Sequence, residues 1–104
     1  MIHEYNIKGI PLKFYDSIWS VTSDVVAGEI NNNPEYNFEN IDFKEGDSVI
    51  DIGGNIGMIS IFLAKKYPFL KIYAFEPVKQ NYDNFLKNIK LNNIPNGIIT
   101  DVLK

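Results

Sequence analysis

The chain has 104 residues, of which 45% are hydrophobic, and it carries a formal net charge of −3. This length allows one domain at most, and the hydrophobic fraction is ordinary for a globular protein. The acidic balance argues against a nucleic-acid-binding protein, which usually carries a basic face. The sequence has no cysteine, which excludes disulfides, thiolate metal sites and cysteine nucleophiles within it. No apolar run is long enough to span a bilayer, and the start lacks the apolar segment of a signal peptide, so we expect a cytoplasmic protein without membrane contact.

Residues 1–45 are predicted to form an N-terminal hairpin and a lead-in segment that together precede the main domain. Within them, residues 3–15 contain two short runs in which apolar and polar residues alternate, separated by Gly9. This pattern indicates two short strands in a hairpin. Pro11 restricts the second strand to an edge position or to the start of the strand.

A short helix is expected over residues 22–30, with an apolar stripe that follows Thr22 and Ser23. Either of these two residues is a suitable N-terminal cap, and the asparagine and proline residues of 31–34 end the helix. The polar stretch that follows has few apolar anchors, and Trp19 before the helix is expected to contribute to packing. The anchors are Phe38, Ile41 and Phe43.

The remaining segment, residues 46–104, shows an alternating pattern of strands and helices. Strands are predicted over 48–52, 71–75 and 98–103, and helices over 58–66 and 78–91. This order is typical of an α/β fold with a parallel sheet and right-handed crossovers. The second strand is a near-continuous apolar run, which indicates a strand that is covered on both faces.

The loop from Asp51 to Gly57 joins the first of these strands to the first helix. Ligands of open α/β sheets bind at the carboxyl ends of the strands, so this loop is the expected binding position. The dinucleotide motif GxGxxG fails, because its later positions fall on Asn55 and Met58, and the phosphate loop lacks its Lys-Ser or Lys-Thr pair. Asp51 is negative and no basic residue lies in the loop. A ligand without phosphates therefore fits best.

Glu76 ends the second strand of this segment, 19 positions after Gly57. A carboxylate at about this spacing binds the hydroxyls of a ribose, because each oxygen accepts from one hydroxyl of the diol. A ribose without phosphates beside a glycine loop describes an adenosyl thioether or sulfonium ligand. The positive sulfonium would be favoured near Asp51.

The sequence GDSVIDIGGNIGMISIFLAKKYPFLKIYAFEPVKQNYDNFLKNIKLNN resembles the first half of class I S-adenosylmethionine-dependent methyltransferases. Its DxGxNxG loop, its FEP motif and the closing LKNIKLNN are most similar to the FkbM-type family. The resemblance covers roughly residues 36–95. It implies a Rossmann-like parallel sheet, S-adenosylmethionine as the cofactor and methyltransferase activity (EC 2.1.1.-).

The resemblance also implies roles for individual residues. The methionine end of the cofactor would be held by Asp51 and by the backbone of Gly53, Gly54, Asn55 and Gly57. Glu76 would bind both ribose hydroxyls, and Pro77 and Val78 would lie against the adenine. No metal and no catalytic residue is implied. The chain ends at Lys104, where the third strand of the sheet has only begun, so we expect a truncated domain that lacks the fourth strand, the substrate loops and any catalytic base.

Each candidate site residue also has a purely structural interpretation. Asp51 is a suitable cap for the turn, the glycines suit any tight strand–helix connection, and Glu76 is compatible with a solvated acid at a strand end. Three functions stay open at this point: methyl transfer to an oxygen or nitrogen of a small-molecule acceptor, a non-catalytic module, and a dehydrogenase-type nucleotide-binding module. A missing fourth strand would leave 48–52 at the sheet edge, so we also expect a homo-oligomer.

Overall fold

The computed structural model describes residues 1–16, 22–32 and 41–103. Strands β1 (Ile2–Ile7) and β2 (Ile10–Tyr15) form an antiparallel hairpin in which Ile7 is paired with Ile10. The two-residue loop between them, Lys8-Gly9, has positive φ at both positions. Such loops are favoured because their twist matches that of the two strands. The predicted hairpin is confirmed.

Helix α1 (Thr22–Asn32) follows the hairpin and extends two residues beyond the predicted end at Ile30. Its first turn is capped by Asp16, whose carboxylate accepts the amide N–H of Ser23 at 3.0 Å. Of the two expected caps, Ser23 is bonded through its hydroxyl to the phenol of Tyr5 at 2.6 Å, and the side chain of Thr22 lies outside the described residues. Trp19, Phe38 and the lead-in around residues 36–40 lie outside the described residues.

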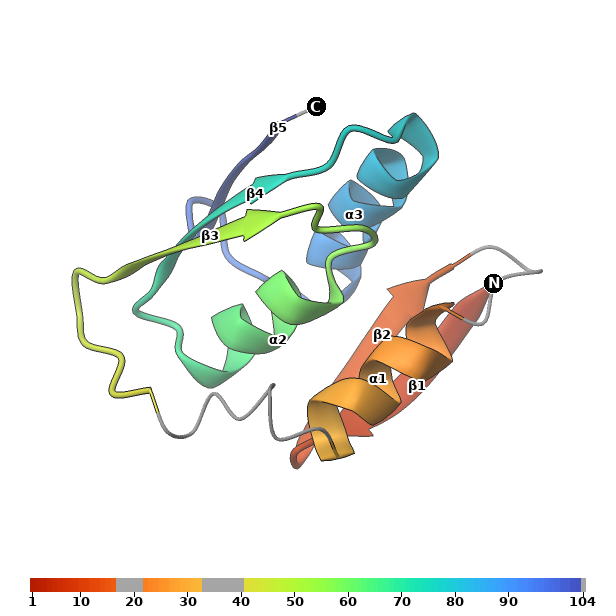
Figure 1. The fold of residues 1–104 in the computed structure, drawn as a ribbon, viewed down its shortest axis with the longest axis horizontal. Coiled ribbons are helices and arrows are strands. Elements are labelled where there is room, and N and C mark those ends of the chain that lie inside the picture. The colour runs from red at the N-terminus through yellow and green to blue at the C-terminus, as the bar shows by residue number, and fades with distance from the viewer. Residues whose placement is uncertain (17–21, 33–40, 104) are drawn as a thin grey trace.

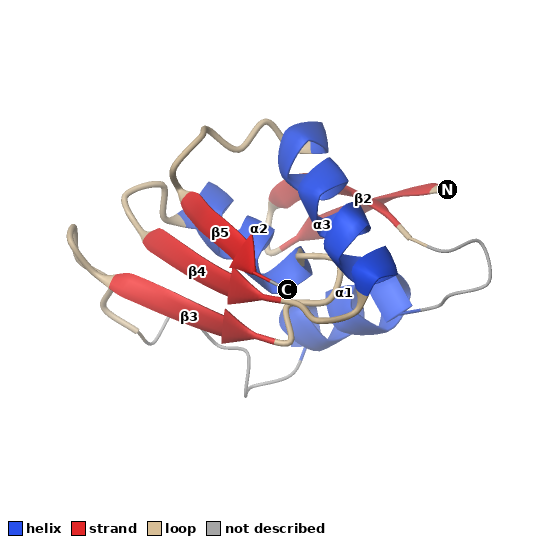
Figure 2. Ribbon diagram, turned by 90° about the horizontal axis from the view of Figure 1, so that it is seen from above, coloured by secondary structure: helices blue, strands red, loops and turns tan. Residues whose placement is uncertain are grey.

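The alternating segment forms a parallel sheet in the order β3-β4-β5. Its strands are β3 (Ser48–Ile52), β4 (Lys71–Phe75) and β5 (Ile99–Leu103), and its connecting helices are α2 (Met58–Lys66) and α3 (Lys79–Leu91). Figure 2 shows the three strands side by side with their arrows in one direction. The order of elements agrees with the prediction, with α3 and β5 each beginning one residue later than expected.

The parallel sheet is covered on one face only among the described residues. In β4, Ile72 and Ala74 are buried, whereas Tyr73 and Phe75 are each 36% exposed. Ile72 packs in the core that includes α2, and Ala74 packs against Phe85 of α3. The predicted coverage of both faces is wrong. Right-handed crossovers between strands that follow one another across a sheet place both helices on the same side.

Helices α2 and α3 lie between the parallel sheet and the hairpin (Figure 1), and β2 contacts both of them. The hairpin forms a separate sheet and folds back on the helices of the same chain, so it does not extend the parallel sheet. Phe14 of β2 and Phe62 of α2 are fully buried in a shared core. Over the described residues, no helix has the length and hydrophobicity required to cross a bilayer.

Candidate functional site

The glycine loop is fixed to the end of the neighbouring strand. In the sheet register Asp51 is paired with Ala74, so β3 and β4 end at the same edge. The amides of Gly53 and Gly54 then both donate to the carbonyl of Phe75, at 2.8 and 3.0 Å. The loop therefore begins directly beside the residue that follows Phe75, which is Glu76.

Glu76 points at the glycine loop. Its Oε1 accepts the amide N–H of Asn55 at 2.8 Å, and its Oε2 accepts the amide N–H of Val78 at 2.8 Å. The residue is only 5% exposed, so the interpretation of Glu76 as a solvated acid is wrong. An ionised carboxylate has about four acceptor positions, and these two bonds leave acceptor capacity on each oxygen.

Asp51 is tied to the first turn of α2, because its Oδ2 accepts a hydrogen bond from the Ser60 hydroxyl at 2.6 Å. This contact places a carboxylate at the end of a helix where its charge is favoured. Asp51 also lines a cavity beside the loop. The structural interpretation of Asp51 and its expected position at a binding site are therefore compatible.

Two of the loop glycines have a packing reason that the sequence analysis missed. A Cβ atom on Gly54 or on Gly57 would lie 2.6 Å from the ring of Phe85, which is fully buried on α3. Gly57 in addition has φ 94°, a left-handed conformation that disfavours side chains. Gly53 differs, since open space lies where its Cβ would be. The sequence predicted a helix over this segment but not the contact of Phe85 with the loop.

A cavity of about 200 Å3 lies between the glycine loop and α1. Four of the six expected cofactor-binding residues line it, namely Asp51, Gly53, Gly54 and Asn55, together with Val26, Ile56, Met58 and Ile59. Gly57 and Glu76 are not among its lining residues. Val26 of α1 was not expected at the site. Pockets for drug-sized ligands usually reach about 300–1,000 Å3, so this cavity accommodates one part of such a ligand. A larger cavity, of about 470 Å3, lies away from the loop, between the hairpin and the end of α3.

Most amides of the loop already have acceptors inside the chain. Those of Gly53 and Gly54 donate to Phe75, that of Asn55 to Glu76, and that of Gly57 to the carbonyl of Gly54. Phosphate-binding loops instead direct successive amides at the ligand. With the carboxylates of Asp51 and Glu76 nearby, this loop suits a neutral or positive ligand better than a phosphate. The ligand without phosphates stays a prediction.

Comparison with known proteins identifies relatives of one kind. No protein-family model matches the chain. It is 32% identical over 84 residues to methyltransferase sdnD of Sordaria araneosa, a match that covers 81% of this chain and 32% of sdnD. The chain is a distant homologue of methyltransferases.

Two further methyltransferases that match parts of this chain support the same relationship. Methyltransferase 1 of Beauveria bassiana (strain ARSEF 2860) is 38% identical over 52 residues, or 50% of this chain and 21% of its own length. The 31-O-demethyl-FK506 methyltransferase FkbM of Streptomyces tacrolimicus is 40% identical over 37 residues, or 36% of this chain and 14% of its own length. The chain thus spans at most about a third of the length of these relatives.

Proposed function

We propose that this chain is the cofactor-binding part of an FkbM-type, S-adenosylmethionine-dependent methyltransferase. The observation that carries the proposal is the buried carboxylate of Glu76, held against the amide of Asn55 at the shared edge of β3 and β4. The methyltransferase relatives supply independent support for a methyl-donor cofactor.

The described residues suit each part of the proposed ligand. Glu76 retains acceptor capacity for a ribose diol after its two backbone bonds. Val78, the residue two positions later, is apolar and 54% exposed, which suits contact with the adenine ring. Asp51 contributes a negative charge to the cavity wall, where a positive sulfonium would be favoured.

When bound, the cofactor would supply a methyl group on a positive sulfur, transferred to an oxygen or nitrogen acceptor by in-line displacement as the carbon–sulfur bond breaks. Catalysis of this kind depends mostly on holding the two reactants in line, so a site can work without a nucleophilic side chain. In this proposal the chain's own residues bind and orient the donor. We assign none of them a catalytic role.

Calorimetric titration with S-adenosylhomocysteine tests the proposal. We expect the wild-type chain to bind and Glu76→Ala to bind at least about tenfold more weakly, because hydrogen bonds to a charged group contribute about 1.5–3 kcal/mol. Glu45→Ala is the matched control, since Glu45 is exposed in the loop before β3, and it should bind like the wild type. Circular dichroism confirms that each variant is folded. Absent binding by the wild type, or equal binding by Glu76→Ala, contradicts the proposal.

A second candidate function is a non-catalytic module that associates with another chain. It is favoured by the uncovered sheet face, on which Ile50 is 65% exposed and Ile52 is 82% exposed. This candidate predicts association in light scattering without any heat of binding for S-adenosylhomocysteine. The two measurements together separate it from the cofactor-binding function.

A further inference from the structure

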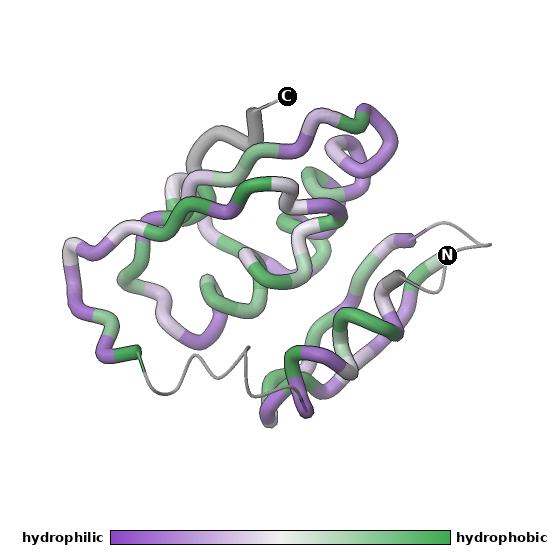
Figure 3. The backbone as a smooth tube through the Cα atoms, viewed as in Figure 1, coloured by the Kyte–Doolittle hydropathy of each residue, from purple (hydrophilic) through white to green (hydrophobic). Residues whose placement is uncertain are grey.

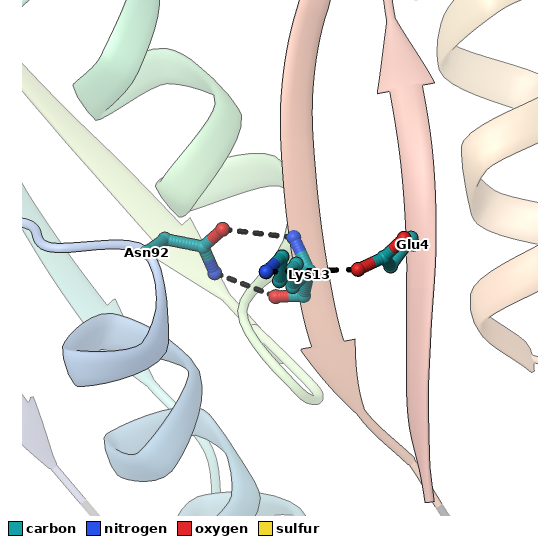
Figure 4. Close-up of polar contacts among 3 residues, drawn as sticks. All are labelled: Glu4, Lys13 and Asn92. Atoms are coloured by element: carbon teal, nitrogen blue, oxygen red, sulfur yellow. Dashed lines mark hydrogen bonds and ion pairs between the residues drawn. The ribbon is translucent and has the colours of Figure 1, made fainter.

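Asn88 of α3 and Asn92, the residue at the C-terminal cap of α3, attach the helix to the outer edge of β2 in the same way. The side-chain oxygen of Asn88 accepts the amide N–H of Tyr15 at 2.6 Å, and its nitrogen donates to the Tyr15 carbonyl at 3.2 Å. Asn92 repeats this pattern with the amide and carbonyl of Lys13, at 2.9 and 2.6 Å. Figure 4 shows the Asn92 amide facing the backbone of Lys13, whose side chain pairs with Glu4.

The spacing of the two asparagines matches the spacing of the strand. Four residues of an α-helix rise about 6 Å, and two residues of a strand rise about 6.7 Å. Side chains one helical turn apart, on α3 and at its C-terminal cap, therefore reach alternate residues of β2, in the manner of an additional strand. Asn88 is 0% and Asn92 5% exposed, so these bonds are shielded from water.

Asn88 makes one contact that Asn92 lacks. Its side-chain nitrogen also donates to the carbonyl of Ile56 at 2.8 Å, inside the glycine loop. Phe85, one turn earlier on α3, packs against the loop at Gly54 and Gly57. The loop therefore packs on one face of α3, and the carboxamide of Asn88 joins the loop to the hairpin.

We propose that Asn88 is a positioning residue for the cofactor, which holds the glycine loop through the Ile56 carbonyl and couples the loop to the docked hairpin. This inference rests on the proposed function. A purely structural role, in which Asn88 only attaches the hairpin, would give the loss of Asn88 and the loss of Asn92 the same effect on ligand affinity. The contact with Ile56 is what distinguishes the two roles.

The variants Asn88→Ala and Asn92→Ala form a matched pair. Each removes a carboxamide, two bonds to β2 and one further bond, which Asn88 donates to the Ile56 carbonyl of the loop and Asn92 donates to the Asn88 carbonyl of the helix. Only Asn88→Ala therefore removes a bond to the loop. We expect both to lower the melting temperature. S-adenosylhomocysteine affinity should fall about tenfold in Asn88→Ala, the effect of one lost buried hydrogen bond, and less than about twofold in Asn92→Ala. Equal losses in the two variants, or no loss in Asn88→Ala, would overturn the proposal.

Amide hydrogen exchange tests the same coupling without ligand. In the unliganded chain, Asn88→Ala should accelerate exchange at Asn55 and Gly57 severalfold more than Asn92→Ala does. This comparison separates the two proposals: if the wild type binds no S-adenosylhomocysteine, the proposed function fails, while exchange still decides whether Asn88 holds the loop. Equal exchange in the two variants would refute that role.

Wild-type protein provides a test that needs no variant. Coupling between two sites is reciprocal, so a ligand that orders the loop should also order the backbone of Tyr15, which Asn88 holds on the hairpin. We expect S-adenosylhomocysteine to slow exchange of the Tyr15 amide more than that of the Lys13 amide, which is bonded to Asn92. Equal slowing at the two amides would overturn the coupling even if Asn88→Ala does not fold.

Discussion

Two neighbouring glycines of the loop differ in what a side chain would meet at each position. Gly54 and Gly53 are neighbours, yet a Cβ on Gly54 would overlap the Phe85 ring, whereas a Cβ on Gly53 meets open space. Gly53 instead has φ 72°, which disfavours a side chain through backbone strain. The two glycines thus resist substitution for different physical reasons.

Alanine substitutions should separate these reasons. We expect Gly54→Ala to lower the free energy of unfolding by about 1–3 kcal/mol through overpacking, and Gly53→Ala by about 1–2 kcal/mol through strain. In a Phe85→Leu background, the cost of Gly54→Ala should fall and that of Gly53→Ala should not change. Urea unfolding of the single and double variants measures both costs. An unchanged cost of Gly54→Ala in that background would contradict the packing explanation.

Helix α1 is attached to the hairpin by polar contacts at both ends. Near its start, the Tyr5 phenol donates to the Asp24 carboxylate and lies 2.6 Å from the Ser23 hydroxyl. Near its end, the Asn31 side chain accepts the amide N–H of Lys8 at 2.8 Å and donates to the carbonyl of Asn6. Because Val26 of α1 lines the cavity, these contacts also set one wall of the candidate site.

Alkaline pH should weaken the Tyr5 contact. Burial, which disfavours the charged phenolate, and the hydrogen bond to Asp24 raise the pKa of Tyr5 from 10.0 to about 12. The folded state therefore holds this proton more tightly than the unfolded state. The resulting stabilisation is complete below pH 10 and is lost as the pH rises from 10 to 12.

The variant Tyr5→Phe tests this pH dependence. It lacks the titrating phenol, so its free energy of unfolding should fall less steeply than that of the wild type between pH 10 and 12. At pH 8 it should be less stable by about 1 kcal/mol, the usual contribution of a hydrogen bond. Urea titrations at pH 8, 10 and 12 give the free energy of unfolding of both proteins. An equal fall in that free energy between pH 10 and 12 would contradict the assignment of the pH dependence to Tyr5.

Prediction from sequence succeeded for elements whose signal is local. The hairpin, α2, β3 and β4 were located from alternation, helical periodicity and turn residues, which depend on near neighbours. The burial of Asn88 and Asn92 could not be predicted in that way. Their partners in β2 lie 73 and 79 positions away in the sequence, and polar residues on a helix are ordinarily expected to face water.

At the scale of the whole molecule, the parallel sheet exposes one apolar face, and within the part of the chain that the structure describes its outer strands β3 and β5 each pair on one side only. Strand β3 pairs with β4 alone among the described residues, and Ile50 and Ile52 of β3 are largely exposed. Figure 3 shows the hydrophobic colour along β3, interrupted by its polar residues. Exposed apolar patches and unpaired strand edges both promote association. We therefore propose that the 104-residue chain self-associates through this sheet.

Light scattering coupled to size-exclusion chromatography tests the association. We expect the wild-type chain to form dimers or larger assemblies as its concentration rises, and Ile52→Lys to shift the population toward monomer. Ile2→Lys is the matched control, because Ile2 is also an exposed isoleucine on a strand, at 45%, but lies on the hairpin. A wild-type chain that stays monomeric at high concentration would refute this expectation.

The sequence by itself determined the order of the elements, the loop at residues 51–57 and the carboxylate at 76, because strand–helix alternation brings the ends of parallel strands to one edge. Only the tertiary structure decided which face of the sheet is covered, and how Phe85 and Asn88 support the loop. These features depend on contacts between elements far apart in the chain. A local pattern of residues reports only on near neighbours, so these long-range contacts could not be inferred from it.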